Sequence, residues 1–175
     1  MYNDIHEILF TEEEIFEKVK YLGKQISQDY NKNDEIVVVG VLKGASVFMA
    51  DLIRQIDIPV YIDFMAVSSY GYSTESSGIV RILKDLDFEI EGRNVLIVED
   101  IIDTGLTLKY LTDNLRSRNV KSLKICTLLD KPERRKCNLD IDYIGFEIPD
   151  KFVVGYGIDY CERYRNLPYV AVIKE

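Results

Sequence analysis

The sequence predicts an α/β fold, with a doubly wound and mainly parallel sheet flanked by helices. Two continuous aliphatic runs, IVVVGVL (36–42) and VLIV (95–98), are typical of strands covered on both faces. These runs alternate with amphipathic segments through the middle of the chain, which implies right-handed βαβ crossovers. At roughly 150 residues per domain, the 175 residues fit a single domain spanning 1–175.

The first third of the chain predicts helix, strand and helix. Thr11 opens a capping box, and apolar residues then recur at helical spacing over about 12–29. The buried strand 36–42 follows. After Gly44, apolar residues recur at i, i+3, i+4 and i+7, which predicts a second helix over 45–56 with its apolar stripe on the sheet.

The middle third predicts strands around a long loop. Pro59 restarts an extended segment over 60–67. The polar stretch 68–78 has no apolar period and is interpreted as a long mobile loop. Residues 79–83 are interpreted as the returning strand of a hairpin, and a turn then precedes the buried strand 95–98.

The last third predicts one more helix and several short strands. Leu108, Leu111 and Leu115 mark a helix that ends near Asn119. A polar loop is expected over 131–138. The remaining apolar runs are interpreted as strands, namely 123–129, 143–147, 152–154 and 169–173.

Composition restricts the possible partners. Acids outnumber bases by 30 to 22, a net charge of −8, which argues against a nucleic-acid binder with a basic surface. Cys126, Cys137 and Cys161 show no paired spacing and are interpreted as reduced thiols. The sequence shows no signal peptide, and no apolar run approaches the length of ~20 residues that a membrane span needs. The expectation is a cytoplasmic protein without a membrane partner.

Acidic residues follow the buried strand 95–98. Glu99, Asp100 and Asp103 have no basic residue among them. Two carboxylates about 4 Å apart repel by about 4 kcal/mol at an effective dielectric near 20. A divalent cation or a hydroxyl-rich ligand would relieve that repulsion, so this strand end is a candidate binding site.

The next residues, Asp103 to Thr107, lie where the strand turns into a helix. Small residues and hydroxyls there leave backbone N–H groups free at a helix N-terminus, a favoured place for a phosphate group. Each residue taken singly fits a plain helix cap. Taken together after a hydrophobic strand, they favour a site for a sugar phosphate.

These segments resemble the type I phosphoribosyltransferases, because four aliphatic residues followed by EDIIDTGLT match that family's phosphoribosyl-pyrophosphate signature. Within the family the likeness is to the hypoxanthine-guanine phosphoribosyltransferases. It extends to VGVLKGASVF (39–48), Ser69-Tyr70, LLDK (128–131) and DKFVVGYGIDYCERYRNLPYV (150–170). The resemblance implies a type I phosphoribosyltransferase-like fold, with a small hood from the N- and C-terminal segments and a mobile hairpin loop.

The resemblance also implies purine salvage. The implied reaction is magnesium-dependent transfer of the 5-phosphoribosyl group from phosphoribosyl pyrophosphate to hypoxanthine or guanine, giving IMP or GMP and pyrophosphate. Asp103 matches the general base or acid. Glu99 and Asp100 match acids that hold the ribose hydroxyls and help place Mg²⁺, and Asp159 matches a residue at the metal and purine edge. The residues that match the 5-phosphate loop are Thr104, Gly105, Leu106 and Thr107, with Leu106 where some relatives carry lysine.

The remaining matches concern pyrophosphate and the base. Leu42, Lys43 and Gly44 match a pyrophosphate loop that often holds a cis peptide bond, and Arg165 matches a second pyrophosphate contact. Residues 68–78 are expected to close as a lid that brings Ser69 and Tyr70 to pyrophosphate. The matches to the purine site are Lys131 as donor to the 6-oxo group, Phe152 as the stacking ring and Val153 as a backbone contact.

Three alternatives remain open. One is a phosphoribosyltransferase for another base, although the ammonium of Lys131 donates to an oxo group and not to an exocyclic amine. The second is a nucleotide-sensing regulator that binds RNA or DNA, and the third is a flavodoxin-like domain. The basic run Arg134-Arg135-Lys136 is interpreted as a solvated loop. Family analogy suggests a homodimer or homotetramer.

Overall fold

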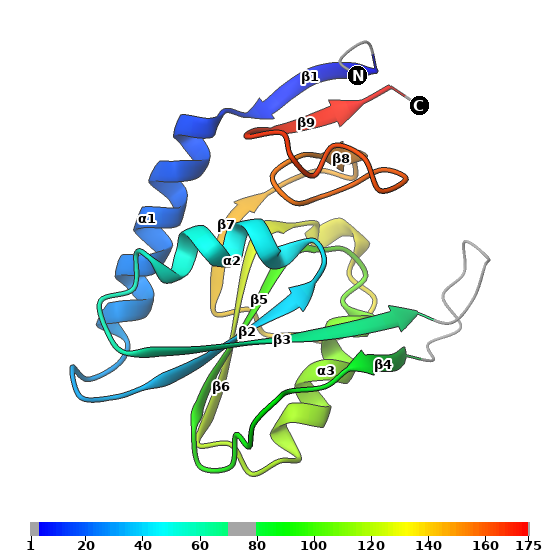
Figure 1. Cartoon of the computed structure of the whole chain (residues 1–175). Helices are drawn as coiled ribbons and strands as arrows, with labels where there is room; N and C mark the ends of the chain where they lie inside the picture. Colours follow the sequence, from blue (N-terminus) through cyan, green and yellow to red (C-terminus); the bar gives the residue numbers. More distant parts are fainter. Residues whose placement is uncertain (1–3, 70–79, 175) are drawn as a thin grey trace.

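The computed structural model describes residues 4–69 and 80–174. Its main sheet has the strand order β4-β3-β2-β5-β6-β7 (Figure 1). The strands of this sheet are β2 (Ile36–Leu42), β3 (Val60–Ser69), β4 (Val80–Lys84), β5 (Asn94–Ile102), β6 (Ser122–Asp130) and β7 (Tyr143–Glu147). All neighbouring pairs are parallel except β3 with β4, which confirms the mainly parallel sheet.

Helices cover both faces of this sheet. They are α1 (Glu12–Gln28), α2 (Ala45–Ile53) and α3 (Leu106–Arg116), and a short 3₁₀ turn, η1 (Pro132–Arg134), follows β6. Ile36 and Val38 of β2, with Leu96 and Val98 of β5, pack in the apolar cluster of α1 and α2. The odd-numbered Val37, Val39, Val41, Val95 and Ile97 of the same strands pack with α3. The alternation along each strand therefore produces the doubly wound arrangement.

A second, antiparallel sheet forms the hood, in the order β1-β9-β8. Its strands are β1 (Ile5–Phe10), β8 (Val153–Val154) and β9 (Val170–Ile173). In Figure 1 the hood lies beyond the carboxyl ends of β2 and β5. The hood was expected, but β1 was not predicted as a strand. Three of its six residues are exposed and its partner β9 lies far along the sequence, so it carries no local pattern.

Several boundaries differ from the sequence prediction. The capping box of Thr11 and Glu14 is present, and α1, β2 and β7 lie where expected. α2 ends at Ile53, before the predicted end at residue 56. β3 continues to Ser69 and so takes the first two residues of the predicted loop. In the described part of the chain, no helix has both the length and the apolarity to cross a bilayer.

Candidate active site

The predicted site residues gather where parallel strands end. The carboxyl ends of β2, β5 and β6 lie at the same edge of the sheet, as parallel pairing requires. Leu42 closes β2, and Lys43 and Gly44 follow it before α2. Lys131 directly follows β6, and its backbone N–H donates to the carbonyl of Ile102 at 3.0 Å. The pyrophosphate, ribose and purine candidates therefore share one edge.

β5 extends further than predicted and carries the acidic pair itself. The strand was expected over 95–98, but pairing with β6 continues through Ile102. The acids therefore lie within the last four residues of an interior strand of the sheet. The turn that follows, at Asp103 to Gly105, leads directly into α3.

A small cavity forms at this turn. It has a volume of about 150 Å³, enough for a few water molecules or a phosphate group. Gly105 caps α3 with a φ of +79°, in the left-handed region that favours glycine. The lining residues include five of the predicted ones, namely Glu99, Asp103, Thr104, Gly105 and Thr107. Leu106 begins α3 but does not line this cavity.

The backbone of the turn is arranged as a helix N-terminus. The Leu106 N–H donates to Thr104 Oγ1 at 3.5 Å, and the Lys109 N–H donates to the Gly105 carbonyl at 2.8 Å. The other first-turn amides have no intrahelical acceptor, as at any helix start. Amides and a helix dipole at one cavity suit an anion.

Glu99 is buried, with 8% of its surface exposed. Burial raises its pKa well above the ordinary value, and the nearby charge of Asp100 raises it further. A carboxyl group in this state is stabilised by a hydroxyl donor or a cation. A raised pKa of this kind is typical of carboxyl groups at ligand-binding sites.

The Asp100 carboxylate lies against Gly44. A Cβ on Gly44 would come within 1.8 Å of Asp100 Oδ2, so only glycine fits there without moving the acid. Burial raises the pKa of Asp100 to about 6, against the lowering effect of two backbone hydrogen bonds. The Arg165 charge also lowers that pKa and the Asp159 charge raises it, so both hood residues act on the same carboxylate. Asp100, Gly44 and these two residues therefore form one cluster.

The loop that matches the family's pyrophosphate loop contains the cis peptide bond that is often found there. The Leu42–Lys43 peptide bond is cis. Lys43 Nζ pairs with Glu162 Oε2 at 3.0 Å, and both side chains are mostly exposed. The hood backbone rests directly on this loop, because a Cβ on Gly157 would lie 2.2 Å from the Gly44 carbonyl oxygen.

Arg165 is held by other residues of the hood segment. Its Nη1 donates to the Gly157 carbonyl at 2.8 Å, and its Nη2 pairs with Asp159 Oδ1 at 2.9 Å. A weaker pair joins Nη2 to Glu162 Oε2 at 3.5 Å. The Asp159 Oδ2 atom accepts from the Glu162 N–H at 2.8 Å. These bonds hold the guanidinium beside the acidic strand end.

The purine candidates lie between β6 and the hood. Lys131 is buried, and its Nζ pairs with Asp150 Oδ1 at 3.3 Å. The Phe152 ring is 46% exposed and meets Tyr160 edge to face, with centroids 5.4 Å apart. Val153 is buried in β8. An exposed ring and a buried lysine are groups that suit a flat heterocycle with an oxo group.

The run Arg134-Arg135-Lys136 was interpreted as a solvated loop, and Arg134 and Lys136 are indeed exposed, but the run also bonds to the turn, which was not predicted. Arg134 Nε pairs with Asp103 Oδ1 at 2.9 Å. Arg135 pairs with Asp130 and donates to the Asp103 carbonyl at 3.4 Å. The Lys136 N–H donates to the Thr104 carbonyl at 2.9 Å. The loop folds onto the turn because Arg134 meets Asp103, 31 residues away, and Arg135 meets Asp130 on the preceding strand.

The predicted metal ligands do not form a preformed cage. Within residues 4–69 and 80–174, no group of three or more His, Cys, Asp or Glu side chains is placed to hold a metal ion. Asp159 is paired with Arg165, and Glu99 lines the cavity at the turn instead. Mg²⁺ commonly takes only one or two carboxylates together with waters and substrate phosphates. Asp100 and Asp159, whose charges interact, could supply such a pair of carboxylates.

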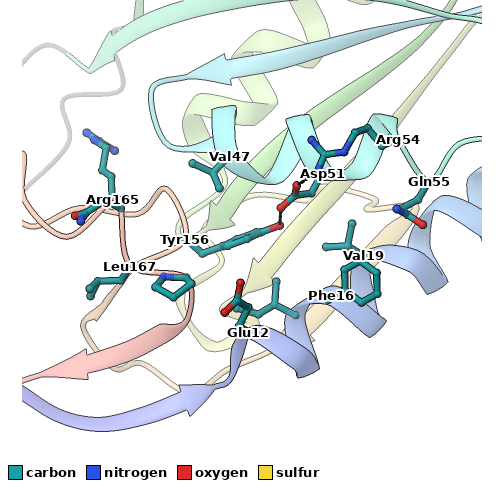
Figure 2. Close-up of a pocket in the computed structure, with 13 residues that line it drawn as sticks. Glu12, Phe16, Val19, Val47, Asp51, Arg54, Gln55, Tyr156, Arg165 and Leu167 are labelled. Carbon is teal, nitrogen blue, oxygen red and sulfur yellow. Dashed lines mark hydrogen bonds and ion pairs between the residues drawn. The ribbon is translucent and has the colours of Figure 1, made fainter.

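A separate cavity of about 420 Å³ lies between α1, α2 and the hood (Figure 2). Of the predicted site residues, only Arg165 lines it. Figure 2 shows Tyr156 with its hydroxyl directed at Asp51, where it donates to Oδ2 at 2.5 Å. Burial, together with this bond, raises the Tyr156 pKa, so the hydroxyl stays protonated. This cavity is not where the predicted chemistry gathers.

Two predicted contacts cannot be placed. Tyr70 and most of the predicted lid, residues 70–78, lie outside the described residues. Ser69 ends β3, beside Val80 of β4. The sequence did not single out Asp130, Arg134 or Asp150 as site residues, because only tertiary contacts bring them to the turn.

Comparison with known proteins identifies the family of this chain. Residues 7–161 match the family model described as phosphoribosyl transferase domain. The chain is 58% identical over 174 residues to the hypoxanthine-guanine phosphoribosyltransferase of Bacillus subtilis, covering 99% of this chain and 96% of that one. It is 55% identical to the protein of the same name from Staphylococcus aureus, covering 99% and 97%. A crystal structure of a hypoxanthine phosphoribosyltransferase from Staphylococcus aureus superposes with a TM-score of 0.95 at 55% identity, covering 99% and 94%.

Proposed function

The chain belongs to the phosphoribosyl transferase family, and we propose that it transfers the 5-phosphoribosyl group of phosphoribosyl pyrophosphate to hypoxanthine or guanine. The products are IMP or GMP and pyrophosphate. One observation carries the proposal: Glu99 lines the same cavity as Asp103, Thr104, Gly105 and Thr107 of the turn. An acid for sugar hydroxyls and a cradle for a phosphate group therefore meet at one place.

The two ends of the sugar phosphate fit two groups of residues. The 5-phosphate binds the amides of Thr104, Gly105 and Thr107, and Glu99 and Asp100 accept from the ribose hydroxyls. Lys43 and Arg165 hold pyrophosphate, which gains negative charge as its bond to the anomeric carbon breaks. Both cations already hold a carboxylate, Glu162, at 3.0 and 3.5 Å, so an anion suits the space between them.

The purine binds against the hood. Phe152 stacks on the ring, Lys131 donates to the 6-oxo group, and the backbone of Val153 reads the ring edge. Asp103 accepts the proton that leaves one imidazole nitrogen while the other attacks the anomeric carbon. This arrangement favours 6-oxopurines over adenine and pyrimidines.

Magnesium fits as the cofactor, held by Asp100 and Asp159 together with substrate oxygens. When bound, it would neutralise charge on the pyrophosphate. Removing divalent cations with EDTA should stop transfer, and adding Mg²⁺ should restore it. Activity that survives complete chelation would contradict the magnesium requirement while leaving the transferase proposal intact.

The deciding experiment measures nucleotide formation from phosphoribosyl pyrophosphate with hypoxanthine, guanine, xanthine, adenine and uracil. We expect hypoxanthine and guanine to react. Asp103→Asn should lower the rate by about 10²-fold to 10⁴-fold, because a carboxamide cannot accept the proton. Turnover of uracil or adenine alone, or no turnover of any base, would refute the proposal.

The three free cysteines fit a reducing compartment such as the cytoplasm. Sedimentation would test the expected homodimer or homotetramer.

A further inference from the structure

Four charged side chains form a continuous chain of ion pairs beside the purine site. Asp103 Oδ1 pairs with Arg134 Nε at 2.9 Å, and Arg134 Nη1 pairs with Asp150 Oδ2 at 3.3 Å. Asp150 Oδ1 in turn pairs with Lys131 Nζ at 3.3 Å. The charges alternate along this chain. It connects the two groups to which we assign the proton and the 6-oxo group of the purine.

The contact to Asp103 is one-sided. Arg134 reaches only Oδ1, and Oδ2 has no partner among the side chains and backbone groups that the structure describes. A carboxylate is planar, so a bond at one oxygen also sets the direction of the other. The two donors of Arg134 lie in one rigid plane, fixed at its other end by Asp150. Arg134 therefore determines where Oδ2 points.

We propose that Arg134 is a positioning residue, which binds Asp103 through Oδ1 and presents Oδ2 to the purine. This inference rests on the proposed function. During transfer, Oδ2 takes the proton from one imidazole nitrogen. The other nitrogen forms its bond to the anomeric carbon, and pyrophosphate departs with the electron pair of the broken bond. Arg134 stays protonated throughout and continues to donate to Oδ1.

The neighbouring Arg135 has a different structural role. Arg135 pairs with the buried Asp130 and donates to the backbone carbonyl of Asp103, so it fixes the turn and not the carboxylate. The Arg134–Asp103 pair is about half exposed, with side-chain exposures of 46% and 45%. Exposed ion pairs contribute little to stability. Removing Arg134 should therefore change catalysis more than folding.

The test compares Arg134→Gln, Arg134→Lys and the control Glu133→Gln. Glu133 is exposed in the same 3₁₀ turn and has no assigned role. Single-turnover rates, with enzyme in excess, keep slow variants measurable. We expect Arg134→Gln to lower the rate about tenfold, part of the usual contribution of a general base, with the KM for phosphoribosyl pyrophosphate within about twofold. Arg134→Lys should recover most of the rate, and Glu133→Gln should match the unaltered chain.

A second comparison separates positioning from other effects. In the Asp103→Asn background, Arg134→Gln should cause no further loss, because Arg134 acts through that carboxylate. Equal losses in both backgrounds, or a full rate in Arg134→Gln, would overturn the inference while the proposed function stands. If the unaltered chain makes no nucleotide from hypoxanthine or guanine, the proposed function itself fails. The two failures are therefore distinguishable.

Discussion

Replacing Gly44 by alanine tests whether the cluster at the end of β2 controls the reaction. The backbone at Gly44 is right-handed helical, with φ −56° and ψ −46°, so alanine fits the backbone without strain. The new Cβ would lie 1.8 Å from Asp100 Oδ2, whereas ordinary contact begins at 3.4 Å. The carboxylate must retreat by more than about 1 Å. A misplacement of this size costs about 100-fold in rate when the group positions the reactants.

Stability should change much less. Overpacking costs about 1 to 3 kcal/mol, and the lower end applies because the atom that must move is the tip of a side chain. At this chain length, about 1 kcal/mol lowers Tm by about 2 to 4 °C. The assay is nucleotide formation from hypoxanthine and phosphoribosyl pyrophosphate, with thermal unfolding measured in parallel.

Gly92→Ala is the matched control. Gly92 has a φ of +69° and nothing within 4 Å of an added Cβ, and it lies at the opposite end of β5 from the acids. The left-handed backbone should cost alanine about 1 to 2 kcal/mol, so both variants lose similar stability. Only Gly44→Ala should lose the reaction. An unchanged rate in Gly44→Ala, or an equal loss in both variants, would refute the reasoning.

Two further changes test the turn and a distant ion pair. Gly105→Ala, at φ +79°, puts a Cβ 2.9 Å from Arg135 Nη1. We expect stability to fall by about 1 to 2 kcal/mol and the KM for phosphoribosyl pyrophosphate to rise. An unchanged KM would contradict the proposed phosphate site at this turn. Hydrogen bonds from Lys124 and Tyr143 lower the Asp29 pKa, so this stabilisation is present above the ordinary value near 3.9 and disappears as the pH falls through the folded value. Because Asp29 is half exposed, Asp29→Asn should lower the free energy of unfolding by less than about 1 kcal/mol at pH 7. Near pH 2 the substitution should have no effect. Urea unfolding at both pH values tests this, and equal losses of stability at the two would contradict it.

The sheet could be predicted from the sequence because its strands are marked locally. The run 36–42 is apolar throughout, and this alone identifies a strand covered on both faces. β1 has no such signal, because only three of its residues are shielded and its partner is β9. A strand of that kind is defined by its pairing, which no local window contains.

The same distinction applies to the site. Glu99, Asp100 and the turn after them are adjacent in sequence, so their shared position could be predicted from the strand that precedes them. The position of Arg134 could not be predicted, because its partner Asp103 is 31 residues away. A basic run has the same appearance in sequence whether water or a carboxylate surrounds it. Only the path of the loop after β6 decides between them.

The hood makes the order of synthesis matter. The proposed phosphate site is formed by β5 and α3, which are complete once translation has passed Arg116. The covering sheet needs β9, whose residues Val170–Ile173 pair with both β1 and β8. A nascent chain that stalls before Val170 would thus have the proposed phosphate site without the covering sheet, and the side proposed for the base would be open to water. The proposed base site would therefore be complete only late in synthesis, when the strand made last pairs with the one made first.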